Sequence, residues 1–63
     1  MKLKDCVVGD KVKDNLKLKL YNWGTGTITG FCETVFNQKA VLVYWDKAER
    51  CKAIVPENIN KIL

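Results

Sequence analysis

The sequence predicts an all-β fold in which five short strands form a small barrel, within a single domain that covers residues 1–63. β-Branched and aromatic residues gather in runs of strand length, and glycine or other turn-forming residues separate these runs. No segment has the periodicity of a long helix. Because so few short strands cannot build a useful two-layer sandwich, we expect them to close into a barrel, which leaves no exposed edges.

Each expected strand has its own signal. Residues 41–45 are the clearest strand because they are β-branched, aliphatic or aromatic throughout. Residues 24–31 are rich in glycine and threonine, which suits a strongly bent strand. Residues 16–20 alternate leucine and lysine and predict a half-buried strand or an extended loop arm. The expected strands of the barrel cover residues 10–13, 24–31, 41–45, 51–55 and 59–63, with turns at 36–39 and 46–49 and a short 3-10 turn at 56–58.

The register of the third strand decides which side chains form the core. Side chains alternate between the two faces of a strand, so either Val43 and Trp45 or Leu42 and Tyr44 point inward. We prefer the first register because it buries the larger indole ring. In the second strand, Ile28 and Phe31 are expected inside, with a bulge near Gly30 and with Thr27 and Thr29 outside. The expected core comprises Val8, Val12, Ile28, Val41, Val43, Trp45, Ile54, Val55, Ile59 and Ile62.

Composition narrows the class of protein. The sequence has no apolar run near the roughly 20 residues that a membrane span needs and no apolar segment of a secretion signal near Met1. We therefore expect no membrane partner and a cytoplasmic location. Three widely spaced cysteines without histidine form a poor disulfide framework and a poor zinc site, so they are expected as reduced thiols that fill small apolar spaces. Neither a metal nor another cofactor is expected.

The residues available for catalysis are few. The sequence contains no histidine and no serine, so a cysteine nucleophile would lack its usual histidine base. The glycines do not form a phosphate-binding loop, because the lysine and hydroxyl residue of that motif do not follow them. A chain of 63 residues also rarely encloses a pocket for a small molecule. We expect a binding module without enzymatic activity and without a small-molecule substrate.

Four blocks of sequence, in order along nearly the whole chain, resemble the SH3-like barrels of the Tudor and KOW kinds. The blocks are VGDKV at residues 8–12, WGTGTI at 23–28, VLVYWD at 41–46 and PENINKI at 56–62. By pattern they are similar to the Tudor-like C-terminal domains of superfamily-1 repair helicases and to the KOW domains of transcription elongation factors. The resemblance implies a five-stranded SH3-like barrel with a short 3-10 turn before the last strand.

Basic and aromatic residues suggest what the barrel binds. The net charge is +4, and residues 1–19 hold six lysines against three aspartates. Lysines hold phosphates and exposed rings stack on bases, so their combination favours nucleic acid. Ten lysines against one arginine argue against base-specific readout, and the expected binding is weak, salt-sensitive and independent of sequence. The candidate binding residues are Lys11, Lys13, Lys17, Lys19, Tyr21, Trp23, Tyr44, Arg50 and Lys52.

The residues alone leave open the role of the lysine-bearing face, the role of the aromatic rings and the function itself. A lysine-bearing face can also be an ordinary solvated surface, and Trp45, Phe31 and Phe36 are expected in the core. The other aromatic rings can form a cage for a methylated cation, a stacking platform for bases, or further core. The alternative function is a protein-docking module that regulates a nucleic-acid machine, which the resemblance would identify as RNA polymerase, a helicase or the ribosome.

Overall fold

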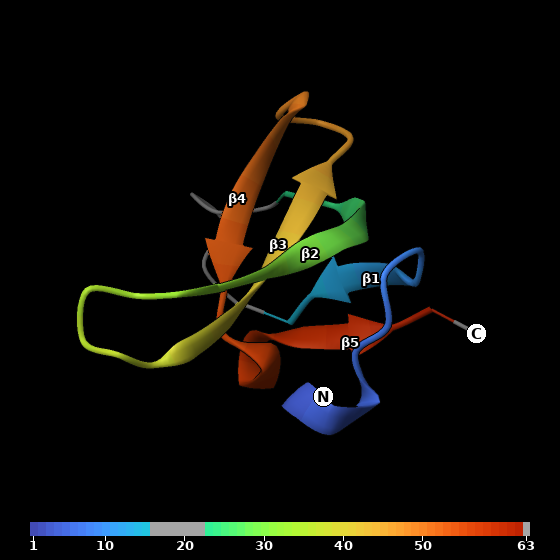
Figure 1. Ribbon diagram of the computed structural model, residues 1–63. Helices are drawn as coiled ribbons and strands as arrows, with labels where there is room; N and C mark the ends of the chain where they lie inside the picture. Colours follow the sequence, from blue (N-terminus) through green and yellow to red (C-terminus); the bar gives the residue numbers. More distant parts are fainter. Residues whose placement is uncertain (16–22, 63) are drawn as a thin grey trace.

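The computed structural model describes residues 1–15 and 23–62 and shows that this part of the chain is all-β, as predicted (Figure 1). The strands are β1 (Lys11–Asp14), β2 (Thr25–Glu33), β3 (Lys39–Trp45), β4 (Arg50–Ile54) and β5 (Ile59–Lys61). One-turn 3-10 helices precede β1 and β5, namely η1 (Leu3–Asp5) and η3 (Pro56–Asn58). The predicted 3-10 turn before the last strand is confirmed. The strand or loop arm predicted at residues 16–20 lies outside the described residues.

All five strands belong to one antiparallel sheet in the order β4-β3-β2-β1-β5. The chain follows β1 to β4 as neighbours and then returns through η3, so that β5 pairs with the free side of β1. β4 and β5 are therefore the two edges of the sheet. Within the described residues these edges are not hydrogen-bonded to each other, so the sheet is open and the expected closure is not seen.

The predicted register of β3 is confirmed. Val41, Val43 and Trp45 are completely buried, whereas the Tyr44 ring is 39% exposed on the opposite face. We call the face that carries Trp45 the core face and the face that carries Tyr44 the outer face. Burial of the indole decides this register because Trp45 has the largest apolar surface of the strand to remove from water.

The core is formed mainly by the residues that the sequence indicates. Two of the ten core residues named above, Val8 and Ile62, are exposed, so these two predictions are wrong. Val8 lies in a turn in which Asp10 N–H donates to Val7 O, and Gly9 has a φ of 100° that suits glycine. Ile62 is three residues beyond the buried Ile59, and an odd spacing in a strand reverses the face. The confirmed core residues are Val12, Ile28, Val41, Val43, Trp45, Ile54 and Ile59, with Val55 half-buried; Cys6 and Ala40 are additional buried residues.

A bulge between Ile28 and Gly30 interrupts the β2–β3 pairing, as predicted. Phe31, however, is exposed and not part of the core. Beyond the bulge β2 pairs only with β3, because β1 reaches no further along β2 than Thr27. This end of the hairpin therefore projects from the body of the protein (Figure 1), and Phe31 has little to pack against. The sequence shows an apolar residue in a strand but not how far the neighbouring strands extend.

Gly26 gives a sharp test of this packing. A Cβ atom at this position would lie 2.6 Å from the Tyr44 carbonyl oxygen and 2.6 Å from Val43 Cγ1, closer than real contacts allow. We expect Gly26→Ala to lower the free energy of unfolding by about 1–3 kcal/mol, the usual cost of overfilling a core. Urea denaturation followed by tryptophan fluorescence measures the change.

Gly30→Ala is the matched control, because its Cβ would meet only Leu42 Cδ1 at 3.8 Å, an ordinary contact. This variant is expected to keep the stability of the parent within about 1 kcal/mol, the size of a simple Gly→Ala backbone effect. Equal destabilisation by the two variants would contradict the close approach of β2 and β3 at Gly26.

Candidate functional site

One cross-strand row on the outer face joins two of the predicted binding residues. Lys11 of β1 pairs with Thr27 of β2, Thr27 pairs with Tyr44 of β3, and Tyr44 pairs with Cys51 of β4. The Lys11 ammonium donates to Thr27 Oγ1 at 2.7 Å, which directs it across the sheet towards the tyrosine. Thr27 and Cys51 are small, so the Tyr44 ring keeps an accessible surface between them.

Lys13 extends the positive charge of this row. It lies on the same face as Lys11 and pairs with Thr25 on one side and Asn60 on the other. Thr25, the β2 residue opposite Lys13, donates from Oγ1 to Asp46 Oδ2 at 3.2 Å. The Asp46 carboxylate is therefore hydrogen-bonded to Thr25. The outer face thus presents two exposed lysines beside an exposed tyrosine. We call Lys11, Lys13 and Tyr44 the outer-face patch.

Arg50 and Lys52 lie on the other side of β4. Arg50 pairs with Trp45 and Lys52 with Val43, and directly opposed residues of antiparallel strands share a face. Both basic residues therefore extend from the core face, near the edge of the sheet. The candidate residues in the described part of the chain are therefore divided between two surfaces.

Lys52 belongs to a stack of charged and aromatic side chains. Its ammonium lies 5.1 Å from the centroid of the Trp23 ring, within the range of a cation–π interaction. The Trp23 ring in turn packs edge-on against Trp45, with centroids 5.2 Å apart and planes at 62°. The backbone N–H of Trp23 also donates to Asp14 Oδ2 at 3.0 Å. Trp23 is half-buried and packs against the core.

Three candidate residues, Lys17, Lys19 and Tyr21, lie outside the described residues, so their part in any surface stays a prediction.

The described residues contain one further polar feature near Trp23. The indole N–H of the buried Trp45 has no hydrogen-bond acceptor among them. An unpaired buried donor is uncommon in proteins.

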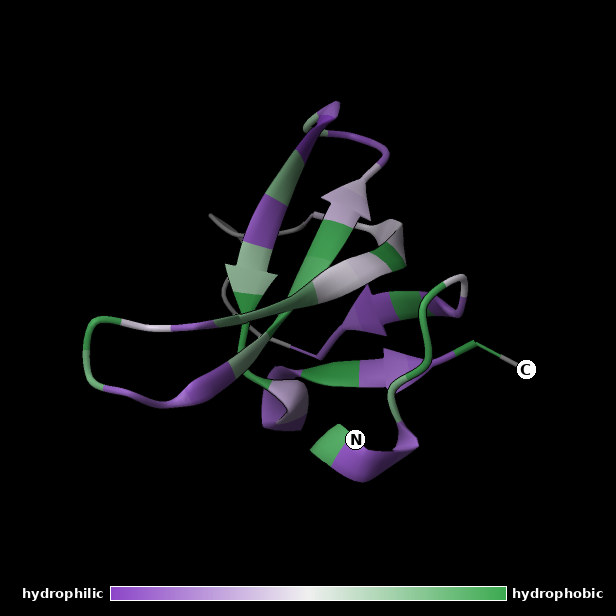
Figure 2. Cartoon of the chain, viewed as in Figure 1, coloured by the Kyte–Doolittle hydropathy of each residue, from purple (hydrophilic) through white to green (hydrophobic). Residues whose placement is uncertain are grey.

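The β2–β3 hairpin carries an exposed aromatic side chain that the sequence predicts in the core. Phe36 was expected in the core and is instead 86% exposed, next to Val35 at 92%. Figure 2 shows this end of the hairpin as a hydrophobic bend at the periphery of the molecule. The expected turn at residues 36–39 held the relevant signal for Phe36, because an apolar side chain within a turn has no neighbouring strand to cover it.

The cysteines differ in their surroundings. Cys6 is buried, Cys32 is half-buried and Cys51 is exposed, and all three are free thiols. Burial raises the pKa of the Cys6 thiol, and the N-terminal ammonium opposes this in part. In residues 1–15 and 23–62 no group of three or more acidic or cysteine side chains could hold a metal ion. The same residues include no helix long and apolar enough to cross a membrane.

Comparison of the chain with protein-family models, curated proteins and solved structures gave no match. The resemblance to Tudor-like and KOW domains therefore stays a prediction that depends on the four sequence blocks.

The stack of Lys52, Trp23 and Trp45 can be tested by removing only its charge. Lys52→Met keeps the aliphatic stem but loses the ammonium, so we expect the free energy of unfolding to fall by about 0.5–1 kcal/mol, the value of an exposed cation–π contact. Lys4→Met, at an exposed position in η1, is the control and should change stability less. Equal losses in the two variants would exclude a contribution from the stack.

Thiol labelling tests the burial of the cysteines. At pH 8, iodoacetamide should modify Cys51 fastest and Cys6 slowest, because a buried thiol with a raised pKa forms less thiolate and is less accessible. Peptide mass spectrometry after short reaction times gives the three rates. In urea the rates should become similar. Rapid labelling of Cys6 in the folded protein would contradict its place in the core.

Proposed function

We propose that this protein is a non-catalytic module that binds nucleic acid weakly and without sequence preference through the outer-face patch. The observation that carries the proposal is the row in which Lys11 and Tyr44 flank Thr27 across three neighbouring strands. An ammonium group beside an exposed ring suits a nucleotide, because the ammonium holds the phosphate while the ring stacks on the base.

The chemistry of the patch sets the expected kind of binding. Lys11 uses one of its three N–H groups on Thr27 and keeps two for phosphate oxygens. Lysine is a compact charge without the forked geometry that reads guanine bidentately. Binding by this patch is therefore mainly electrostatic, and it weakens steeply as the salt concentration rises.

We further propose that the open sheet is an incompletely closed SH3-like barrel of the Tudor or KOW kind. Three observed features support this assignment: five short antiparallel strands, a bulge that bends β2 after Ile28, and the 3-10 helix η3 immediately before β5. The strands and the 3-10 helix are what the resemblance implies, and the bulge is expected from the glycine- and threonine-rich residues 24–31.

Charge reversal on the outer face tests nucleic-acid binding. The double variant Lys11→Glu/Lys13→Glu should lose binding to short single-stranded oligonucleotides, measured by fluorescence anisotropy at about 50 mM salt, where phosphate contacts are strong. Tyr44→Ala should weaken the same binding but leave its salt dependence unchanged, because the ring contributes stacking and no charge. In the parent protein, the two lysines together should contribute about 1.4 to the slope of log affinity against log salt.

Lys2→Glu/Lys4→Glu is the matched control, since it makes the same change in net charge at exposed positions around η1. It should retain most of the binding. The proposal fails if the parent protein does not bind at about 50 mM salt, or if the control weakens binding as much as the outer-face variant does.

A second candidate function is protein docking, in which the module attaches to a larger nucleic-acid machine such as RNA polymerase, a helicase or the ribosome. The exposed Val35 and Phe36 favour it, because adjacent apolar side chains held in water mark sites of protein interaction. The two functions use different parts of the molecule, so one does not exclude the other.

A further inference from the structure

The β2–β3 hairpin extends beyond the rest of the sheet. β4 pairs with β3 only from Val41 to Trp45, and β1 pairs with β2 only as far as Thr27. The last two pairs before the turn, Cys32 with Ala40 and Glu33 with Lys39, have no third strand beside them among the described residues. Residues 34–38, which we call the tip, therefore project from the molecule (Figure 1).

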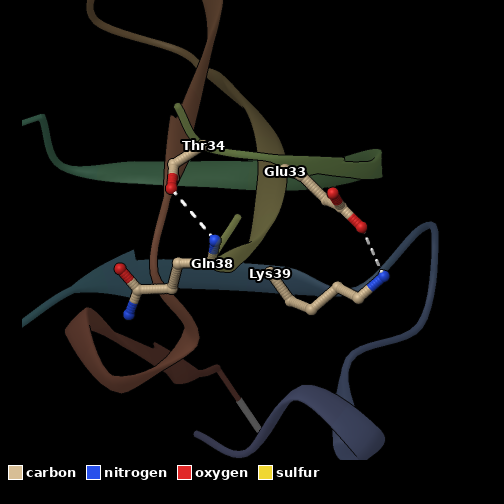
Figure 3. Close-up of polar contacts among 4 residues, drawn as sticks. All are labelled: Glu33, Thr34, Gln38 and Lys39. Atoms are coloured by element: carbon tan, nitrogen blue, oxygen red, sulfur yellow. Dashed lines mark hydrogen bonds and ion pairs between the residues drawn. The ribbon is translucent and has the colours of Figure 1, made fainter. Parts of the chain in front are cut away.

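Local hydrogen bonds fix the conformation of the tip. Thr34 Oγ1 accepts from Phe36 N–H at 3.3 Å and from Gln38 N–H at 3.2 Å. Thr34 N–H donates to Gln38 O at 2.9 Å, and Asn37 N–H donates to Thr34 O at 3.0 Å. Asn37 has a φ of 61°, a conformation that asparagine tolerates better than most residues. Figure 3 shows the bond between Thr34 and Gln38 beside the ion pair at the base of the tip.

That ion pair joins Glu33 Oε1 and Lys39 Nζ at 2.7 Å across the two strands. The hydrogen bond between the two side chains, together with their opposite charges, lowers the pKa of Glu33 and raises the pKa of Lys39. The pair also neutralises the charges nearest to the tip. Because residues 34–38 contain no charged side chain, the whole end of the hairpin is electrically neutral.

The apolar residues of the tip serve neither the turn nor the core. The hydrogen bonds of the turn come from the Thr34 hydroxyl and the backbone, so polar residues at positions 35 and 36 would allow the same conformation. Val35 and Phe36 are almost fully exposed and bury little surface in the protein's own core. Because these hydrogen bonds already hold the backbone of the turn in one conformation, binding through the tip needs less ordering of the backbone.

We propose that the tip is a docking element that inserts Phe36, with Val35 beside it, into an apolar pocket on a different protein. This proposal deepens the second candidate function and is independent of nucleic-acid binding by the outer face. A projecting phenylalanine requires a concave receiver, and a buried aromatic anchor of this kind is a typical hot spot of a protein interface. The neutral end of the hairpin matches a pocket with an uncharged rim.

Shape and charge argue against the other possible occupants. Among the described residues there is no pocket that could receive a phenylalanine, so a second copy of this part of the chain offers no site for Phe36. A neutral tip has no lysine or arginine to attract an anionic membrane or a nucleic acid.

The experiment begins with photocrosslinking in cells that produce the full chain. p-Benzoylphenylalanine replaces Phe36 in one variant and Val8 in another, because Val8 is an exposed apolar residue far along the sequence from the tip. We expect position 36, but not position 8, to crosslink to one particular protein. Mass spectrometry of the crosslinked peptide should place the contact among apolar residues of that protein.

The crosslinked protein is then purified and its affinity for the chain is measured by calorimetry. Phe36→Ala should weaken the binary complex at least tenfold, whereas Val8→Ala should leave its affinity unchanged. Phe36→Ala should keep the circular dichroism spectrum and the oligonucleotide affinity of the parent. If the parent protein does not bind oligonucleotides, that result overturns the nucleic-acid proposal and leaves the docking proposal intact.

Four results would overturn the docking proposal. They are the absence of a specific crosslink from position 36, an unchanged affinity of Phe36→Ala for the purified partner, self-association in sedimentation that depends on Phe36, and flotation with vesicles of phosphatidylcholine and phosphatidylserine that depends on Phe36. The last two results would assign the tip to a second copy or to a membrane surface instead.

Discussion

The close approach of β2 and β3 at Gly26 determines most of this structure. With no side chain at Gly26, the β2 backbone lies directly against the carbonyl oxygen of Tyr44 and leaves space for the buried Trp45 ring. Once Trp45 is inside, the alternation of β3 places Tyr44 outside, in the row that contains Lys11. The same indole supports Trp23, and Trp23 supports the ammonium of Lys52. The outer-face patch and the stack of Lys52 on Trp23 thus both depend on the close approach of β2 to β3 at Gly26, where a side chain would not fit.

The bulge between Ile28 and Gly30 divides β2 into two parts with different roles. Before the bulge, β2 lies between β1 and β3 and contributes Ile28 to the core. After it, β2 has only β3 as a partner and forms the arm that carries the tip. The first part is held by burial of apolar side chains. The arm has little such burial, so its order comes from strand pairing, the hydrogen bonds of Thr34 and the pair of Glu33 with Lys39.

The sequence predicted features that depend on local alternation or on a single residue type. The register of β3 followed from Trp45, and η3 followed from the turn chemistry of residues 56–58. Features that depend on how far a neighbouring strand extends were not accessible. Phe31 is an ordinary core residue by composition, and it is exposed because β1 pairs with β2 no further than Thr27.

The candidate site was predicted only in part for a related reason. Alternation in β4 shows that Arg50 and Lys52 share a face with Ile54, but not which face is buried, because the adjacent Val55 is equally apolar and would point the other way. The pairing of Lys52 with Val43 places both basic side chains on the core face, away from Tyr44. Ile62 is the converse case, since counting three residues from Ile59 is enough to place it away from the core.

The arrangement of charge connects the two proposed surfaces. The outer-face patch lies on the part of the sheet that three neighbouring strands hold in place, and it presents positive charge. The tip lies at the end of a two-stranded arm and is neutral and apolar. A polyanion attracted to Lys11 and Lys13 therefore has no electrostatic reason to cover Phe36, and a protein that receives Phe36 has no need to displace the polyanion. A module of this size can in this way attach to a protein through its hairpin while its sheet contacts nucleic acid.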